Sequence, residues 1–252
     1  MTKQNCYTYL MPTKEYAQKI FQLLKEHYPK AHMILEWGNN FELLVAIILS
    51  AQCTDKKVNE VSSKLFPKYR KERDEFKEKY KEEILRLATL AQDDKLDKEM
   101  IIQLVNFASV PLSELEQDIK STGFYHNKAK SVQNAARVVL EKYHGILPRT
   151  IKEMTSIPGV GRKTANVFLG NAYHISEGIA VDTHVKKQAQ ALGLTKNTDP
   201  DKIEQDLMKL FPQKDWFALT YMLIEHGRNV RRKKSDRLTC GKSDCILCNQ
   251  KS

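Results

Sequence analysis

The chain has 252 residues, and its 41 lysines and arginines against 31 aspartates and glutamates give a formal net charge of +10 and an isoelectric point near 9.2. A hydrophobic fraction of 41% excludes wholesale disorder. No apolar run approaches the roughly 20 residues that span a membrane, and the N-terminus lacks the apolar core of a secretion signal. We therefore expect a soluble cytoplasmic protein, associated with the nucleoid if the source is bacterial. The charge favours an anionic partner, most commonly nucleic acid, although a lysine-rich surface kept for solubility explains it equally well.

Apolar residues recur at helical spacing along the chain and convincing period-two alternation is absent, so the predicted fold class is all-α. Thr13 is expected to cap the first helix and Asn40 the strongly apolar second one. Pro67 is expected to end the third helix, and the spacing of Ser113 and Glu116 predicts a capping box for a later, short helix. The expected helices cover residues 14–27, 41–52, 56–67, 113–120, 128–143, 149–155, 163–172, 182–192, 200–210 and 215–226.

Residues 70–107 have an unusual composition. They begin with the charge-dense RKERDEFKEKYKEEILRLATLA and continue through DDKLD into KEMIIQLVNFA. This pattern predicts a solvated helical hairpin inserted into the fold.

The most informative stretch is Ile157–Ala165, which reads IPGVGRKTA and lies between a short helix and a new helix that starts near Arg162. Its two glycines supply turn dihedrals and allow close approach of a backbone, and the free amides of the new helix can receive a phosphate. The stretch predicts a helix-hairpin-helix over about 149–172, which grips the DNA backbone without reading sequence. An ordinary turn between two helices is the alternative. The expected DNA contacts are Gly159, Val160, Gly161, Arg162 and Thr164.

Two strings, IPGVGRKTANVFL and IAVDTH, closely resemble the endonuclease III branch of the helix-hairpin-helix (HhH-GPD) DNA glycosylase family, and FELLVAIILSAQCTD and STGFYHNKAKSV resemble the same family in the same order. The resemblance covers nearly the whole chain apart from the 70–107 hairpin and the C-terminal tail. It implies two helical lobes with DNA and an extruded base at the cleft between them. Residues 34–175 would form a six-helix barrel lobe containing the helix-hairpin-helix, and residues 1–33 and 176–252 the second lobe.

The resemblance assigns the catalytic nucleophile to Lys163. The positive end of a helix and partial burial both disfavour the ammonium form, which favours a nucleophilic amine. Such an amine attacks the sugar C1′ of a damaged nucleotide and holds it as a Schiff base, and β-elimination then nicks the strand. Without the resemblance, the favoured interpretation of Lys163 is a phosphate contact, as for Arg162.

In the family, the carboxylate that matches Asp182 stabilises positive charge on the sugar and assists proton transfer. Cleavage of a glycosidic bond has oxocarbenium character, which explains the need for an anion. An acidic residue at a helix start is also an ordinary N-cap, and Asp182 can serve both purposes.

Extruding a base leaves a gap in the duplex that the protein must fill. Gln52 matches the family residue that enters this gap, and Phe124 matches a loop position that wedges the opposite strand, where this branch more often has an aliphatic residue. The alternatives are a polar residue at a helix end for Gln52 and an aromatic packed on the core for Phe124.

Most members of this branch end with four cysteines spaced C-x6-C-x2-C-x5-C that hold a [4Fe–4S] cluster. This chain ends with Cys240, Cys245 and Cys248 and has no fourth cysteine in that segment, so we expect no stable cluster. A cluster with a non-cysteine fourth ligand, zinc bound by these cysteines with Asp244 or His226, and no metal at all remain open. The basic run 231–234 would contact phosphate in place of the cluster loop or be a solvated tail.

The resulting hypothesis is a monomeric base-excision-repair DNA glycosylase with AP lyase activity. It removes damaged bases, with oxidised pyrimidines as the favoured class, from double-stranded DNA, and its chemistry requires no cofactor. The alternatives are a monofunctional glycosylase for an alkylated or mismatched base and a non-catalytic DNA-binding protein.

Overall fold

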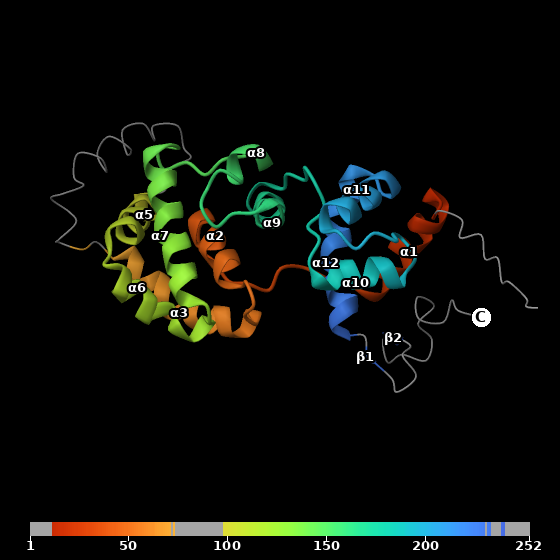
Figure 1. The fold of residues 1–252 in the computed structure, drawn as a ribbon, viewed down its shortest axis with the longest axis horizontal. Coiled ribbons are helices and arrows are strands. Elements are labelled where there is room, and N and C mark those ends of the chain that lie inside the picture. Colours follow the sequence, from red (N-terminus) through yellow and green to blue (C-terminus); the bar gives the residue numbers. More distant parts are fainter. Residues whose placement is uncertain (1–11, 72, 74–97, 230, 233–237, 240–252) are drawn as a thin grey trace, which may run out of the picture. The chain divides into compact units, whose positions relative to one another are not determined.

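A computed structural model describes residues 12–71, 73, 98–229, 231–232 and 238–239 (Figure 1). The predicted all-α fold class is confirmed, since the described residues form helices apart from two antiparallel strands of two residues each. No helix among these residues is long and apolar enough to cross a membrane. The elements are α1 (Lys14–His27), α2 (Asn40–Leu49), α3 (Asp55–Arg70), α5 (Lys98–Ser109), α6 (Leu112–Ile119), α7 (Tyr125–Glu141), α8 (Ile151–Met154), α9 (Arg162–Tyr173), α10 (Thr183–Ala191), α11 (Pro200–Leu210), α12 (Trp216–Asn229), β1 (Arg231–Arg232) and β2 (Leu238–Thr239).

The chain divides into two compact units. Unit 1 takes its described residues from Met1–His32 and Gly178–Ser252, and unit 2 from Met33–Glu177. Unit 1 contains α1, α10, α11 and α12, and unit 2 contains α2, α3 and α5 to α9. Each unit has its own apolar core, so each candidate site residue can be traced to the core that supports it.

The centre of unit 2 is α2. Every residue from Phe41 to Leu49 is buried, as expected of a helix that is apolar on all sides. Around it, α9, α7 and α3 contribute side chains to the same core, and α5 packs on α3 and α7. The only charged residue in this buried stretch is Glu42.

Glu42 is fully buried, and both of its carboxylate oxygens accept hydrogen bonds. Arg70 donates to them from Nε and Nη2, both at 2.7 Å. Gln103 Nε2 donates to Oε1 at 2.7 Å and the Gly38 amide to Oε2 at 2.6 Å. Burial alone raises the pKa of this carboxyl, but the hydrogen bonds outweigh it, and the pKa lies below its usual value. The carboxylate thereby links α2 to α3 and α5.

The predicted solvated hairpin over 70–107 is wrong in its second half. Residues from Met100 to Ala108 are buried apart from Ile102, which is partly exposed, because the apolar face of KEMIIQLVNFA packs into the core of unit 2. Helix α5 is therefore part of the core. Residues 72 and 74–97 lie outside the described residues.

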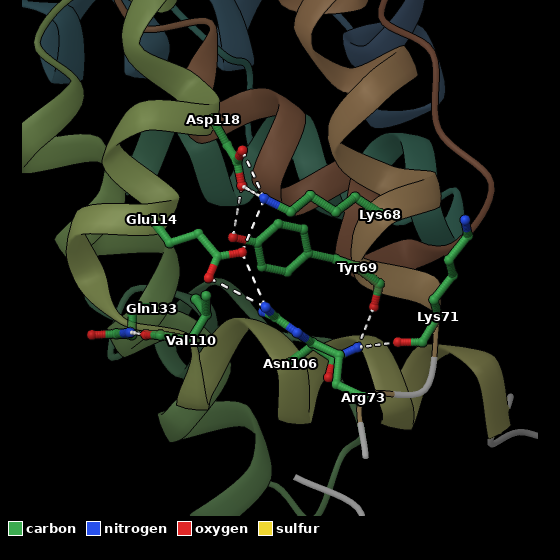
Figure 2. Close-up of polar contacts among 9 residues, drawn as sticks. All are labelled: Lys68, Tyr69, Lys71, Arg73, Asn106, Val110, Glu114, Asp118 and Gln133. Atoms are coloured by element: carbon green, nitrogen blue, oxygen red, sulfur yellow. Dashed lines mark hydrogen bonds and ion pairs between the residues drawn. The ribbon is translucent and has the colours of Figure 1, made fainter. Parts of the chain in front are cut away.

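Helix α3 continues past Pro67 to Arg70, against the prediction that proline ends it. Figure 2 shows why the last turn holds. Asn106 Nδ2 donates to the carbonyls of Tyr69 and Lys71 at 2.6 and 2.9 Å, and Lys68 Nζ donates to Asp118 at 2.7 Å. The Tyr69 ring stacks on Phe107 at 4.1 Å between centroids. Contacts from α5 and α6 thus offset the hydrogen bond that proline cannot make.

Two predicted caps also differ. Asn39, one residue earlier than expected, caps α2 by accepting from the Glu42 amide. Helix α6 begins at Leu112 without a side-chain cap, so the capping box of Ser113 and Glu116 is wrong. A proline at the preceding position fixes the entry of the chain into this helix without a capping side chain.

Candidate DNA-binding and catalytic residues

The helix-hairpin-helix is formed by α8, the turn at residues 155–161, and α9. The side chains of Ile157 and Val160 are buried and anchor the turn on the core of unit 2. Gly159 has φ +81°, and a Cβ there would lie 2.6 Å from Ser131 Cβ on α7. Both the dihedral and the close packing require glycine at this position. The turn therefore packs closely on the core of unit 2 and on α7.

The N-terminus of α9 differs from those of α1, α2, α3, α8, α10 and α11, whose N-caps each accept a hydrogen bond from the first turn. Its N-cap is Gly161, and no side chain caps it. A Cβ on Gly161 would meet no atom within 4 Å, so the space there is open. Such a helix start is suited to an anion because its amides and dipole point outward.

The predicted contact residues fall into two groups. Gly159, Gly161 and Arg162 are exposed, and Thr164 is half-buried. Val160 is 5% exposed, and its amide donates to the Ile157 carbonyl at 3.0 Å. Val160 therefore supports the packing of the turn and offers neither its side chain nor its amide to a ligand.

Lys163 is the second residue of α9 and projects from the uncapped first turn. Its side chain is exposed. The helix start is as predicted, but the partial burial expected from the sequence is wrong. The core-facing side of this helix begins only at Ala165 and Asn166, so residue 163 lies on its outer side.

Asp182 is the N-cap of α10 in unit 1. Its Oδ1 accepts from the amides of His184 and Val185, both at 2.8 Å. Both of these bonds use the same oxygen, and within the described residues Oδ2 accepts none. The cap thus fixes the carboxylate while leaving one oxygen for another partner.

Gln52 and Phe124 both lie in loops of unit 2 and both have left-handed backbones, with φ of +53° and +50°. Non-glycine residues rarely adopt this conformation, and strained residues of this kind cluster at functional sites, although His144 and His174 of this chain share the conformation. Gln52 is exposed and follows the end of α2. Phe124 is 64% exposed, so its packing on the core, the alternative considered above, is wrong.

Comparison with known proteins identifies the family. The family model described as HhH-GPD superfamily base excision DNA repair protein matches residues 45–213. The chain belongs to this superfamily. It is 42% identical over 217 residues to endonuclease III of Synechocystis sp., covering 86% of this chain and 84% of the relative. It is 38% identical over 211 residues to endonuclease III of Bacillus subtilis, covering 83% and 81%.

Comparison with solved structures supports the same assignment to the HhH-GPD superfamily. A non-covalent endonuclease III–DNA complex superposes with a TM-score of 0.75 at 34% identity, covering 95% of this chain and 96% of that one. A trapped covalent endonuclease III–DNA intermediate gives 0.73 at 35% identity, covering 90% and 92%. A thermostable thymine-DNA glycosylase gives 0.61 at 16% identity and shows the fold alone.

Lys128, a buried polar residue four positions after Phe124, is not among the residues predicted from the sequence. Lys128 on α7 is only 5% exposed, and its Nζ donates to the Thr122 carbonyl at 2.8 Å. Its burial could have been predicted from the sequence, because residue 128 shares a helical face with the buried Val132, Ala135 and Val139. A lysine on an apolar face requires a polar partner.

The cysteines predicted as metal candidates in this HhH-GPD chain, Cys240, Cys245 and Cys248, lie outside the described residues, as do Lys233 and Lys234 of the basic run. Among the described residues, no group of histidine, cysteine, aspartate or glutamate side chains could hold a metal ion. His226, the histidine considered for zinc, is buried, and its Nδ1 lies 2.9 Å from the Tyr28 hydroxyl.

Proposed function

We propose that this protein is a base-excision-repair DNA glycosylase with AP lyase activity that acts as a monomer on damaged double-stranded DNA. Its place of action is the cytoplasm, at the nucleoid in a bacterium. The observation that carries the proposal is the exposed Lys163 on the uncapped start of α9. The similarity to endonuclease III, including a relative trapped as a covalent DNA intermediate, supports a lysine nucleophile. Oxidised pyrimidines are the proposed lesions.

Binding begins at the hairpin. The amides at the start of α9, together with the exposed Arg162, receive a backbone phosphate, and the buried Ile157 and Val160 keep the turn in place. These contacts carry no sequence information, as a repair enzyme that acts at any sequence requires. Gln52 enters the gap left by the extruded base, and Phe124 wedges the opposite strand.

The reaction starts at the amine of Lys163. The Lys163 Nζ lone pair attacks C1′, the bond from C1′ to the base breaks, and the base leaves with a proton. The sugar ring then opens: the nitrogen lone pair forms the C=N bond, the C1′–O4′ bond breaks, and O4′ takes up the proton that the amine loses, which gives the Schiff base. Removal of a proton from C2′ then expels the 3′ phosphate, and water releases the enzyme from the sugar. The Asp182 carboxylate, held through Oδ1, stabilises positive charge on the sugar and passes protons.

No step in this scheme requires a metal or cofactor. The three thiols of the tail do not fit a cluster that takes four cysteines. We therefore propose that the tail holds no [4Fe–4S] cluster of the family type.

The proposal is tested with the full chain and a duplex carrying one abasic site. We expect strand cleavage by β-elimination, a covalent adduct upon borohydride reduction, and unchanged rates in EDTA. Duplexes with an oxidised pyrimidine, an alkylated purine and a mismatch then identify the lesion, and the first is expected to be cleaved. Base release without cleavage would indicate a monofunctional glycosylase. Binding without either reaction would indicate a non-catalytic DNA-binding protein.

Variants of Asp182 can separate its role as an N-cap from the role of its negative charge. In Asp182→Asn the amide oxygen still caps α10, because asparagine caps a helix as well as aspartate does. We expect an unchanged unfolding temperature and a single-turnover excision rate lower by about a hundredfold to a thousandfold. Asp182→Ala loses both the cap and the charge, and its free energy of unfolding is expected to be lower by about 1 kcal/mol. Excision at the wild-type rate in the asparagine variant would show that Asp182 is only a cap.

A further inference from the structure

The loop that carries Phe124 accepts two hydrogen bonds from Lys128. Lys128 donates twice, its backbone amide to the Phe124 carbonyl at 3.1 Å and its Nζ to the Thr122 carbonyl at 2.8 Å. These two bonds enclose Gly123 and Phe124. Thr122 is itself buried, and its Oγ1 donates to the Ile119 carbonyl at 2.8 Å. Hydrogen bonds therefore hold the backbone at Thr122 and at Phe124, while the Phe124 side chain is exposed.

The conformation fixed in this way is not one that the chain favours by itself. Gly123 has φ +69° and Phe124 has φ +50°, and a left-handed backbone is strained for an aromatic residue. Helix α7 starts at the next residue without a side-chain cap. Strained residues persist where the surrounding contacts impose them. Here these contacts include the two hydrogen bonds from Lys128 and the one that the Gly123 amide donates to the Lys120 carbonyl at 3.4 Å.

A buried lysine is a costly means of imposing this conformation. Burial lowers the pKa of the Lys128 ammonium, with a smaller opposing effect from the thiol of Cys53, which follows Gln52 in the chain. Among the described residues, its ammonium makes no ion pair, and its Nζ donates a hydrogen bond to the Thr122 carbonyl, although the residue is only 5% exposed. A methionine would fill the same space without the cost of burying a charge.

We propose that Lys128 is a positioning residue that holds Phe124 in its exposed, left-handed conformation, ready to enter the strand opposite an extruded base. The inference rests on the proposed function, because it gives Phe124 the role of a wedge. Lys128 touches neither the substrate nor the reacting atoms. It acts through the backbone of the loop, so it affects only those substrates that have an opposite strand.

The test compares two substrates, a duplex with a damaged base and a single-stranded abasic oligonucleotide that has no opposite strand. For Lys128→Met we expect kcat/KM on the duplex to fall by about tenfold or more, with single-strand cleavage within about twofold of wild type. Phe124→Ala should give the same pattern, and the double variant should be no worse than Phe124→Ala alone, because the two residues act as one unit. Lys130→Met, at an exposed position on the same helix, is the control and is expected to match wild type on both substrates.

The outcomes separate the two proposals. If the wild-type protein cleaves neither substrate, the proposed function fails. If it is active and Lys128→Met lowers both activities equally, Lys128 is merely structural and the inference is overturned. Equal activity of variant and wild type, or effects of Lys128→Met and Phe124→Ala that add fully, would also overturn it. Lys128→Gln, which keeps a shorter polar side chain, undergoes the same comparison if the methionine variant does not fold.

Discussion

Replacing Lys163 with alanine is expected to abolish the borohydride-trapped adduct and to lower single-turnover strand cleavage at an abasic site by at least about a thousandfold. The residue is exposed on the first turn of α9, so its removal leaves no cavity and no buried partner unpaired. We therefore expect an unfolding temperature within experimental error of wild type. The loss then reports chemistry and not stability.

Loss of a positive charge can also weaken DNA binding, so binding is measured separately. Lys163→Ala is expected to bind a duplex with a non-cleavable abasic analogue within a few-fold of wild type, because the other hairpin contacts remain. Lys202→Ala, which removes the same charge from an exposed position on α11, is the matched control and should form the adduct normally. An adduct formed by Lys163→Ala would show that another amine is the nucleophile.

Replacing Glu42 with glutamine is expected to lower the free energy of unfolding of unit 2 by about 3 kcal/mol. The carboxylate accepts from Arg70, Gln103 and the Gly38 amide in a fully buried position, and an amide group offers only one oxygen to these donors. Glu60→Gln is the control, because the ion pair of Glu60 with Lys57 is exposed, and no measurable change is expected. Chemical denaturation of the two variants compares them directly.

The effect of Glu42 should depend on pH. Its pKa in the folded protein lies below the usual value of 4.5, so the stabilisation is fully present above that value and is lost as the pH falls through the folded pKa. The difference in stability between wild type and Glu42→Gln should therefore be constant near neutral pH and shrink below about pH 4.5. A difference that grows as the pH falls would contradict the assignment of Glu42 as a stabilising carboxylate.

Local patterns predict those parts of the fold that depend on neighbours in sequence. The helix of residues 14–27 and its cap Thr13 are as expected, because one apolar stripe and one capping hydroxyl determine them. The extension of α3 through Pro67 and the burial of α5 depend on contacts of Asn106 and Phe107 with a distant segment. No local pattern contains that information.

The same division applies to the candidate site. The hairpin turn and the N-cap at Asp182 follow from short motifs, since both depend on neighbours in sequence. The catalytic roles of Lys163 and Asp182 rest instead on the resemblance to the family. The left-handed backbones of Gln52 and Phe124 are invisible in the sequence, because neither residue type favours that conformation. The exposure of Lys163 and the burial of Val160 likewise depend on which face of the hairpin meets the core.

The two hydrogen bonds that Asn106 donates to the carbonyls of Tyr69 and Lys71 have a consequence for the tolerance of the fold to insertions. They fix the end of α3 beside α5 whatever lies between them, so the chain ends at residues 71 and 98 are already brought together by the core. The entropy of closing a loop between fixed ends grows only with the logarithm of its length. Insertions and deletions between the two helices are therefore expected to cost the fold little stability.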